Sequence, residues 1–201
     1  MEYKNIKLLN DLVVVKPWSP DEIHGLIIPE TAKDNTQKGY VVAVGPGVYD
    51  HKKGVREPLQ VQIGDKVLYT KYAGSEIKFE EGPLHLIMRE GDILGFYKGP
   101  NEADLQPLDN RLFLEWEEAP EEWKGTFILR PHGAPLERYY TGNVLGVGPN
   151  AYDVKVGERV FFDQFCGPEK LVFHGKRYAI ILDTDVFCVI PSRLEMKVVS
   201  Q

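Results

Sequence analysis

The side chains best suited to nucleophilic or metal chemistry are few and scattered in this sequence. It contains two cysteines and five histidines among 201 residues. Thiolates and imidazoles bind zinc when they recur at short, fixed spacings, and no such spacing is present. The residues are Cys166, Cys188, His24, His51, His85, His132 and His174. We therefore expect no catalytic residues, no metal site and no cofactor, and we interpret the protein as not an enzyme.

A glycine-rich stretch, "VGPG" at 44–47, has the composition of a loop that binds phosphate groups. A phosphate-binding loop must open directly into a helix, whose first N–H groups hold the anion. No helical periodicity follows Gly47, so the sequence argues against a dinucleotide site there. The proline and the glycines instead predict a tight turn.

The overall charge and hydropathy exclude further classes. The formal net charge is −6, whereas a nucleic-acid-binding protein needs a basic face, so no nucleic-acid partner is expected. No run of about 18 apolar residues is present, so no membrane span is expected. The start, "MEYKNIKLLN", lacks the apolar core of a signal peptide. We expect a cytoplasmic protein.

The two halves of the sequence repeat one another block by block. "GYVVAVGPGVYD" at 39–50 returns as "GNVLGVGPNAYD" at 142–153. The other matched blocks are "LNDLVVVK" (9–16) with "LDNRLFLE" (108–115), "VQIGDKVLY" (61–69) with "VKVGERVFF" (154–162), and "LIMREGDILGF" (86–96) with "AIILDTDVFCV" (179–189). The register changes only between blocks, where loops absorb insertions. This pattern indicates a duplicated domain.

Each copy consists of short apolar runs separated by Gly, Pro and Asp, which predicts strands of an all-β barrel or sandwich. No window shows a helical period over three turns. The polar segment 99–107, with its two prolines, is expected to be a linker between the units. The tail 193–201 contains "LEMKVV", which fits either an extra edge strand or a frayed end.

The first unit closely resembles the GroES-type co-chaperonins of the chaperonin-10 family, the small lids of barrel-shaped chaperonins. The resemblance is carried by "LNDLVVVK", "GLIIPETAKDNTQKGYVVAVGPG", "VQIGDKVLY" and "LIMREGDILGF", in that order. It implies two tandem GroES-like irregular β-barrels, at 1–98 and 108–192. In the first barrel it implies a mobile loop at about 17–38 and a roof hairpin at about 48–60.

The resemblance also implies a binding site at the tip of the mobile loop. In the family, a matching apolar tripeptide docks in an apolar groove of the chaperonin, and this role falls on Leu26, Ile27 and Ile28. Polar, turn-rich residues flank the three on both sides, which is the composition of a disordered loop. The alternative is that they form a short core strand.

The second unit is a degenerate copy without the roof hairpin. Only Ala151, Tyr152 and Asp153 separate "VGPN" from "VKVGERV". A long loop is still expected at about 116–141, where the mobile loop of the family belongs, with an apolar triplet inside it: Phe127, Ile128 and Leu129. We expect this triplet to be a second chaperonin-binding site. The alternative is an ordinary strand that pairs with "ERYYTGNVLGV" downstream.

The expected function is that of a co-chaperonin that caps an ATP-dependent, GroEL-type chaperonin ring and encloses unfolded substrate without performing chemistry. A homo-oligomeric ring is expected as well. The family's ring has seven barrels, and a whole number of chains with two barrels each cannot supply seven. The tandem lids of plant plastids have the same mismatch. The alternative is a structural or assembly protein that reuses the barrel without binding a chaperonin. A third class is an enzyme, because zinc alcohol dehydrogenases contain a related barrel. Such an enzyme would need zinc ligands and a dinucleotide domain, and the sequence shows neither the ligand spacing nor a βαβ pattern.

Overall fold

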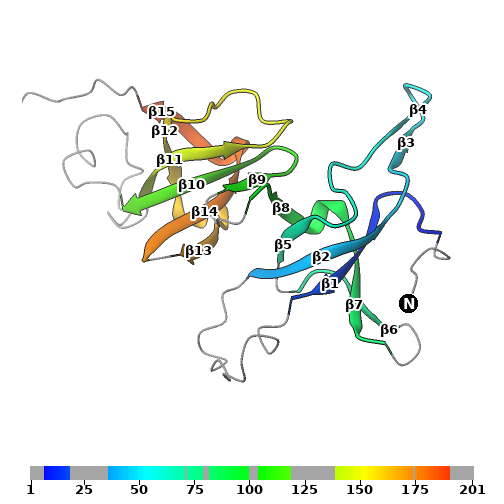
Figure 1. Cartoon of the computed structure of the whole chain (residues 1–201). Coiled ribbons are helices and arrows are strands. Elements are labelled where there is room, and N and C mark those ends of the chain that lie inside the picture. Colours follow the sequence, from blue (N-terminus) through cyan, green and yellow to red (C-terminus); the bar gives the residue numbers. More distant parts are fainter. Residues whose placement is uncertain are drawn as a thin grey trace, which may run out of the picture. The chain divides into compact units, whose positions relative to one another are not determined.

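The computed structural model describes residues 7–18, 36–70, 72–78, 82–99, 104–118, 139–173 and 175–190. These residues form strands, turns and three-residue 3-10 helices (Figure 1). The chain divides into two compact units, Met1–Leu108 and Asp109–Gln201. No helix among the described residues is long and apolar enough to cross a membrane.

The first unit consists of a seven-stranded antiparallel sheet and a separate two-stranded hairpin. The order across the sheet is β6-β7-β1-β2-β5-β8-β9. Its strands are β1 (Leu12–Pro17), β2 (Thr36–Val44), β5 (Lys66–Thr70), β6 (Ser75–Lys78), β7 (Leu84–Arg89), β8 (Ile93–Tyr97) and β9 (Leu105–Pro107). The hairpin pairs β3 (Val48–Asp50) with β4 (Val55–Glu57).

The connection between β7 and β8 shows that this sheet is strongly curved. The two strands lie four places apart in the sheet, which in a flat sheet would separate them by about 19 Å. Only the 3-10 helix η4 (Glu90–Asp92) joins them, and a chain of that length spans at most about 14 Å. The sheet therefore curls into an irregular, open barrel around its core.

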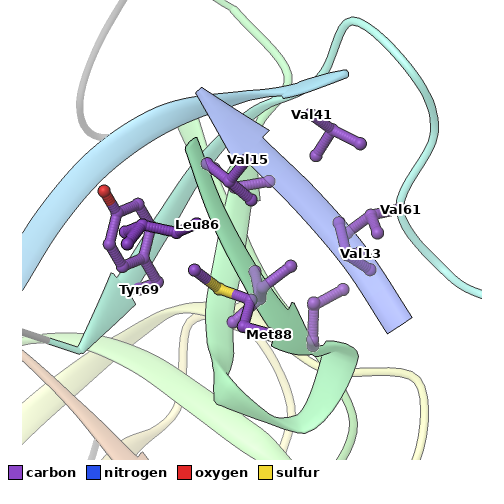
Figure 2. Close-up of a cluster of buried hydrophobic side chains, with 10 residues drawn as sticks. Val13, Val15, Val41, Val61, Tyr69, Leu86 and Met88 are labelled. Carbon is purple, nitrogen blue, oxygen red and sulfur yellow. The ribbon is translucent and has the colours of Figure 1, made fainter. Parts of the chain in front are cut away.

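Because side chains along a strand alternate between its two faces, successive side chains of β1 lie on opposite faces of the sheet. Val13 and Val15 point into the main core, whereas Val14 packs with Leu8 and Ala43 in a smaller cluster on the other face. Figure 2 shows side chains from β1, β2, β5 and β7 converging inside the barrel. The main core contains Val13, Val15, Val41, Val61, Val67, Tyr69, Leu86, Met88, Ile93 and Leu108.

The second unit repeats this sheet, except that it has no counterpart of β9 among its described residues. Its order is β13-β14-β10-β11-β12-β15, and η9 (Asp183–Asp185) makes the same short connection that η4 makes in the first unit. The strands are β10 (Arg111–Glu118), β11 (Tyr139–Val147), β12 (Arg159–Asp163), β13 (Glu169–Phe173), β14 (Lys176–Leu182) and β15 (Val186–Ile190). A further 3-10 helix, η8 (Gln164–Cys166), follows β12.

The duplication extends to irregular details of the backbone. The β1–β2 ladder shifts register between Val14 and Val15, and the β10–β11 ladder shifts at the corresponding place. Asn10 and its counterpart Asp109 both have a positive φ, of 52° and 54°. The all-β fold of two GroES-like barrels, predicted from the sequence, is confirmed.

The repeated "VGP" motif has a steric cause. A Cβ atom on Gly45 would collide with the carbonyl oxygen of Asn10, and one on Gly148 would collide with that of Asp109. The amide of Gly45 donates to the carbonyl of Leu12 at 2.8 Å, so the backbones must approach closely at this turn. Glycine is the residue that allows such an approach.

The last part of the segment 99–107, which was expected to be a linker, forms a strand in the structure. Leu105–Pro107 form β9, which pairs with β8, and the amide of Leu108 donates to the carbonyl of Leu94 at 3.1 Å. Leu105 and Leu108 are buried, because they cover β8. The first unit consequently extends through Leu108.

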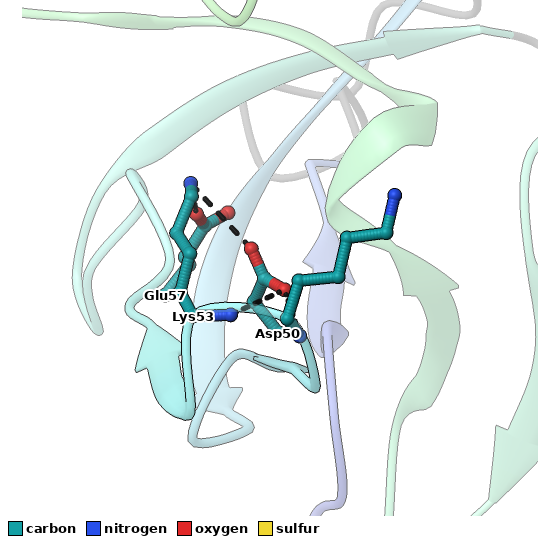
Figure 3. A network of polar contacts seen from close by, with 4 residues as sticks. Asp50, Lys53 and Glu57 are labelled. Atoms are coloured by element: carbon teal, nitrogen blue, oxygen red, sulfur yellow. Dashed lines mark hydrogen bonds and ion pairs between the residues drawn. The ribbon is translucent and has the colours of Figure 1, made fainter.

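The hairpin of the first unit is held by polar contacts at its tip (Figure 3). The Asp50 carboxylate accepts hydrogen bonds from the backbone amides of Lys53 and Lys52, which lower its pKa. The Lys53 ammonium donates to Glu57 at 2.7 Å, which raises the pKa of Lys53. Between β11 and β12 of the second unit, the described residues 148–158 form no strand.

Candidate functional site

The six residues predicted to bind a chaperonin lie outside the described residues. Leu26, Ile27 and Ile28 fall in the segment 19–35, and Phe127, Ile128 and Leu129 fall in the segment 119–138. The structure places the strands at which each segment leaves and re-enters its sheet. We call these strand ends the first loop base (β1 and β2) and the second loop base (β10 and β11).

The first loop base is closed by backbone hydrogen bonding and a cation–aromatic contact. The amide of Trp18 donates to the carbonyl of Lys38 at 2.8 Å, just beyond the last β1–β2 pair. The Lys66 ammonium lies 5.5 Å from the centre of the Trp18 ring and 4.9 Å from that of Tyr97. The two ends of the segment 19–35 are therefore held side by side.

The second loop base extends further along its ladder. Pairing between β10 and β11 continues to Glu118 and Tyr140, so both strands run into the segment 116–141 that was expected to be a loop. Trp116 is buried, and its indole nitrogen donates to the carbonyl of Tyr178 at 3.1 Å. The rings of Trp116 and Tyr140 lie 4.5 Å apart. The tryptophan thus belongs to the barrel and not to the loop.

Two cations cover these aromatic rings. The Lys170 ammonium lies 4.9 Å from the ring centre of Trp116 and 4.8 Å from that of Tyr140. The guanidinium of Arg177 lies 4.7 Å from the ring centre of Trp116. The Tyr140 hydroxyl also lies 3.1 Å from the Gln164 side-chain oxygen, to which it donates. Cation–π contacts of this kind attach β13 and β14 to the second loop base.

One pair of corresponding contacts at the two bases was not predicted from the sequence. By the repeat, Trp18 corresponds to Glu117 and Lys66 corresponds to Arg159. The first base joins its pair by a cation–aromatic contact, whereas Arg159 and Glu117 form an ion pair. Both members of the pair changed together. When the two copies are aligned, both residues of this pair differ between them, and this joint difference is the signal that could have revealed the contact.

The thiols lack the properties of nucleophiles. Burial, followed by the carboxylates of Asp185 and Asp163, raises the pKa of Cys166 to about 11, and burial also raises the pKa of Cys188. Both are therefore protonated at neutral pH, and the protonated thiol is not the reactive form. Within the described part of the chain, no group of three or more His, Cys, Asp or Glu side chains is arranged to hold a metal ion.

Comparison with known proteins gives a family for both units. The pattern of the chaperonin 10 kDa subunit matches the chain twice, at residues 5–97 and 104–190. The 20 kDa chloroplastic chaperonin of Arabidopsis thaliana is 32% identical over 200 residues, which cover 94% of this chain and 77% of that protein. The corresponding protein of Spinacia oleracea is 30% identical over 201 residues, which cover 94% of this chain and 76% of that protein.

A single-domain relative matches over about half of the chain. The co-chaperonin GroES of Rhodothermus marinus is 53% identical over 92 residues, which cover 45% of this chain and 89% of that protein. The chain belongs to the chaperonin 10 kDa subunit family and carries two of its domains. The family predicted from the sequence is confirmed for both units. The two plant relatives are named as chloroplastic, a compartment that differs from the cytoplasm expected from the sequence.

Proposed function

We propose that the protein is a co-chaperonin that caps an ATP-dependent, GroEL-type chaperonin ring and encloses folding substrate. The observation that carries this proposal is the double match to the chaperonin 10 kDa family. The two loop bases support it, because each holds together the ends of a segment that contains an apolar triplet. The relatives named as co-chaperonins support the same class of partner.

The proposed contacts are Leu26, Ile27 and Ile28 in the first segment, and Phe127, Ile128 and Leu129 in the second. Burying three aliphatic side chains gains roughly 5–9 kcal/mol. Ordering the backbone costs about 1–2 kcal/mol for each residue that becomes fixed, so one segment alone binds weakly. Several segments on one ring raise the avidity by about 10²–10⁴. Oligomerisation is therefore part of the proposed mechanism.

A difference between the two units supports a ring. In the first unit, β9 and Leu108 cover β8, in which every residue except Phe96 is buried. In the second unit, the corresponding strand β15 ends the described sheet, and none of its residues is fully buried. Phe187 of β15 is 59% exposed, whereas its counterpart Leu94 is 5% exposed. The apolar strand edge that is covered within the first unit is therefore exposed at the corresponding place in the second unit.

The start of the chain supplies the matching element. By the repeat, residues 7–9 correspond to residues 106–108, and Leu9 corresponds to Leu108. Leu108 is 2% exposed, but Leu9 is 57% exposed. We propose that residues 7–9 of one chain lie along β15 of the next chain as residues 106–108 lie along β8. Such a head-to-tail contact closes into a ring when its rotation allows closure.

The chaperonin contact is tested by retention on an immobilised GroEL-type ring with and without ATP. The double variant Ile27→Ser with Ile28→Ser is expected to abolish ATP-dependent retention, and Ile128→Ser with Leu129→Ser is expected to weaken it. The control is Ile63→Ser, which removes an equally apolar side chain from an exposed turn. It should bind as the parent protein does.

Each outcome separates the candidate functions. If the second double variant binds normally, the second segment is not an anchor. If the parent protein forms a ring but is not retained with ATP, the co-chaperonin proposal fails. The structural or assembly role then remains as the explanation of the fold.

A further inference from the structure

A carboxylate of the barrel holds the end of the β3–β4 hairpin. Glu90 lies in η4, and its Oε1 atom accepts hydrogen bonds from the backbone amides of Gln60 and Val61, the second at 3.1 Å. These two residues follow β4 and return the chain from the hairpin, which projects from its sheet in Figure 1, to the barrel. The Glu90 side chain therefore attaches the hairpin to the connection between β7 and β8.

The second unit, whose described residues 148–158 form no hairpin strands, uses the corresponding position differently. By the repeat, Glu90 corresponds to Asp183 and Asp11 corresponds to Asn110. The backbone contact is the same in both units, because the amides of Glu90 and Asp183 donate to the carbonyls of Asp11 and Asn110, each at 2.9 Å. The side chains differ: Asp183 accepts from the side-chain amide of Asn110 at 2.9 Å. The longer acid thus occurs in the unit that has a hairpin to hold.

We propose that Glu90 is a positioning residue for the hairpin and keeps it over the space that the lid encloses. The role in enclosure rests on the proposed function, whereas the attachment by Glu90 does not. Hydrogen bonds to an ionised acceptor are stronger than those between neutral groups, which suits a point of attachment. Arg56 also donates to the carbonyl of Gly47 at 2.6 Å and so joins the two strands where the hairpin begins. The hairpin leaves the barrel as one body, and Glu90 sets its direction.

The two units suggest the variants that test this role. Glu90→Asp introduces the residue of the second unit, whose shorter side chain withdraws the acceptor from the two amides. Glu90→Gln keeps an acceptor oxygen of the same reach but removes the charge. The matched control is Asp183→Ser, which shortens the corresponding side chain in the unit without a hairpin.

The attachment is measured by amide hydrogen exchange of the free chain. Gln60 and Val61 should exchange about tenfold faster in Glu90→Asp, the factor for loss of a hydrogen bond to a charged acceptor. The acceleration should be smaller in Glu90→Gln and absent in Asp183→Ser. Gly54 donates to the carbonyl of Asp50 within the hairpin at 2.8 Å, and its exchange should not change, because the hairpin stays folded when its attachment loosens.

Two results of the exchange experiment would overturn the proposal. One is equal exchange of Gln60 and Val61 in the parent protein and in Glu90→Asp. The other is an equal acceleration of Gly54, which would mean that Glu90 stabilises the hairpin itself and does not position it.

The role in enclosure is measured by protease digestion of a substrate bound to a GroEL-type ring with a non-hydrolysable ATP analogue. Glu90→Asp should be retained on the ring as the parent protein is, because both loop bases are intact, but the substrate should be digested several-fold faster. Asp183→Ser should protect the substrate as the parent does. Faster exchange with unchanged protection would overturn the role of Glu90 in enclosure. If the parent itself is not retained, the proposed function fails, and the exchange experiment still decides whether Glu90 holds the hairpin.

Discussion

Leu9 and Leu108 occupy corresponding positions in the two copies of the repeat, and they differ in how far the chain covers them. Leu108 packs in the core of the first unit, whereas Leu9 is exposed on the isolated chain. Truncation of each to alanine should therefore act on a different equilibrium. We expect Leu108→Ala to destabilise the folded chain and Leu9→Ala to weaken assembly alone.

The magnitudes follow from the exposure of the two side chains. Truncating a buried leucine costs about 2–5 kcal/mol in the free energy of unfolding, which applies to Leu108→Ala. An exposed site such as Leu9 should lose no more than about 0.5 kcal/mol. If the ring buries Leu9 as deeply as Leu108, its exposure falls from 57% to 2%. That burial contributes about 0.8–1.7 kcal/mol per contact, so Leu9→Ala should weaken each contact about 4- to 18-fold.

The two equilibria are measured separately. Urea unfolding gives the free energy of unfolding, and sedimentation velocity over a range of concentrations gives the assembly midpoint. Two results would refute the reasoning. One is a loss of unfolding free energy in Leu9→Ala comparable to that in Leu108→Ala. The other is an assembly midpoint that Leu9→Ala leaves unchanged.

Two further predictions concern the barrels themselves. Gly148→Ala would push a methyl group into the carbonyl of Asp109, and we expect it to lower the free energy of unfolding, measured in urea, by about 2 kcal/mol or more. The control is Gly91→Ala, whose methyl group meets no atom within 4 Å, and it should be nearly neutral. The Tyr69 hydroxyl is buried and has no hydrogen-bond partner among the described residues, and burial raises its pKa from 10.0 to about 12. The native state thus binds this proton more tightly, so stability should fall as the pH rises from about 10 towards 12. Tyr69→Phe should unfold with an equal or higher free energy at pH 7 and lose less of it above pH 10; a steeper loss would contradict the assignment.

The strands and their duplication could be predicted because their signals are local. Short apolar runs such as residues 12–15 indicate a strand directly, and the turn glycines Gly45 and Gly148 mark the same place in both copies. The repeat then located both loop bases approximately. These features depend on neighbouring residues, which a sequence displays.

The features that were missed depend on contacts between distant residues. The segment with Leu105 appears polar, and it becomes a strand only because β8 offers an apolar edge to cover. Trp116 stands at the start of the segment 116–141, which was expected to be a loop. The carbonyl of Tyr178 and the cations Lys170 and Arg177, all from β13 and β14, instead fix it in the barrel. Such partners cannot be assigned before the strand order is known.

The proposal that this chain is a lid is tested most directly by protection of an enclosed substrate. A labelled unfolded protein is bound to a GroEL-type ring, the chain and a non-hydrolysable ATP analogue are added, and a protease is applied. Enclosure predicts that the substrate survives digestion only when the chain and the nucleotide are both present, and that Ile27→Ser with Ile28→Ser removes this protection. A substrate digested equally fast with and without the chain would contradict the account.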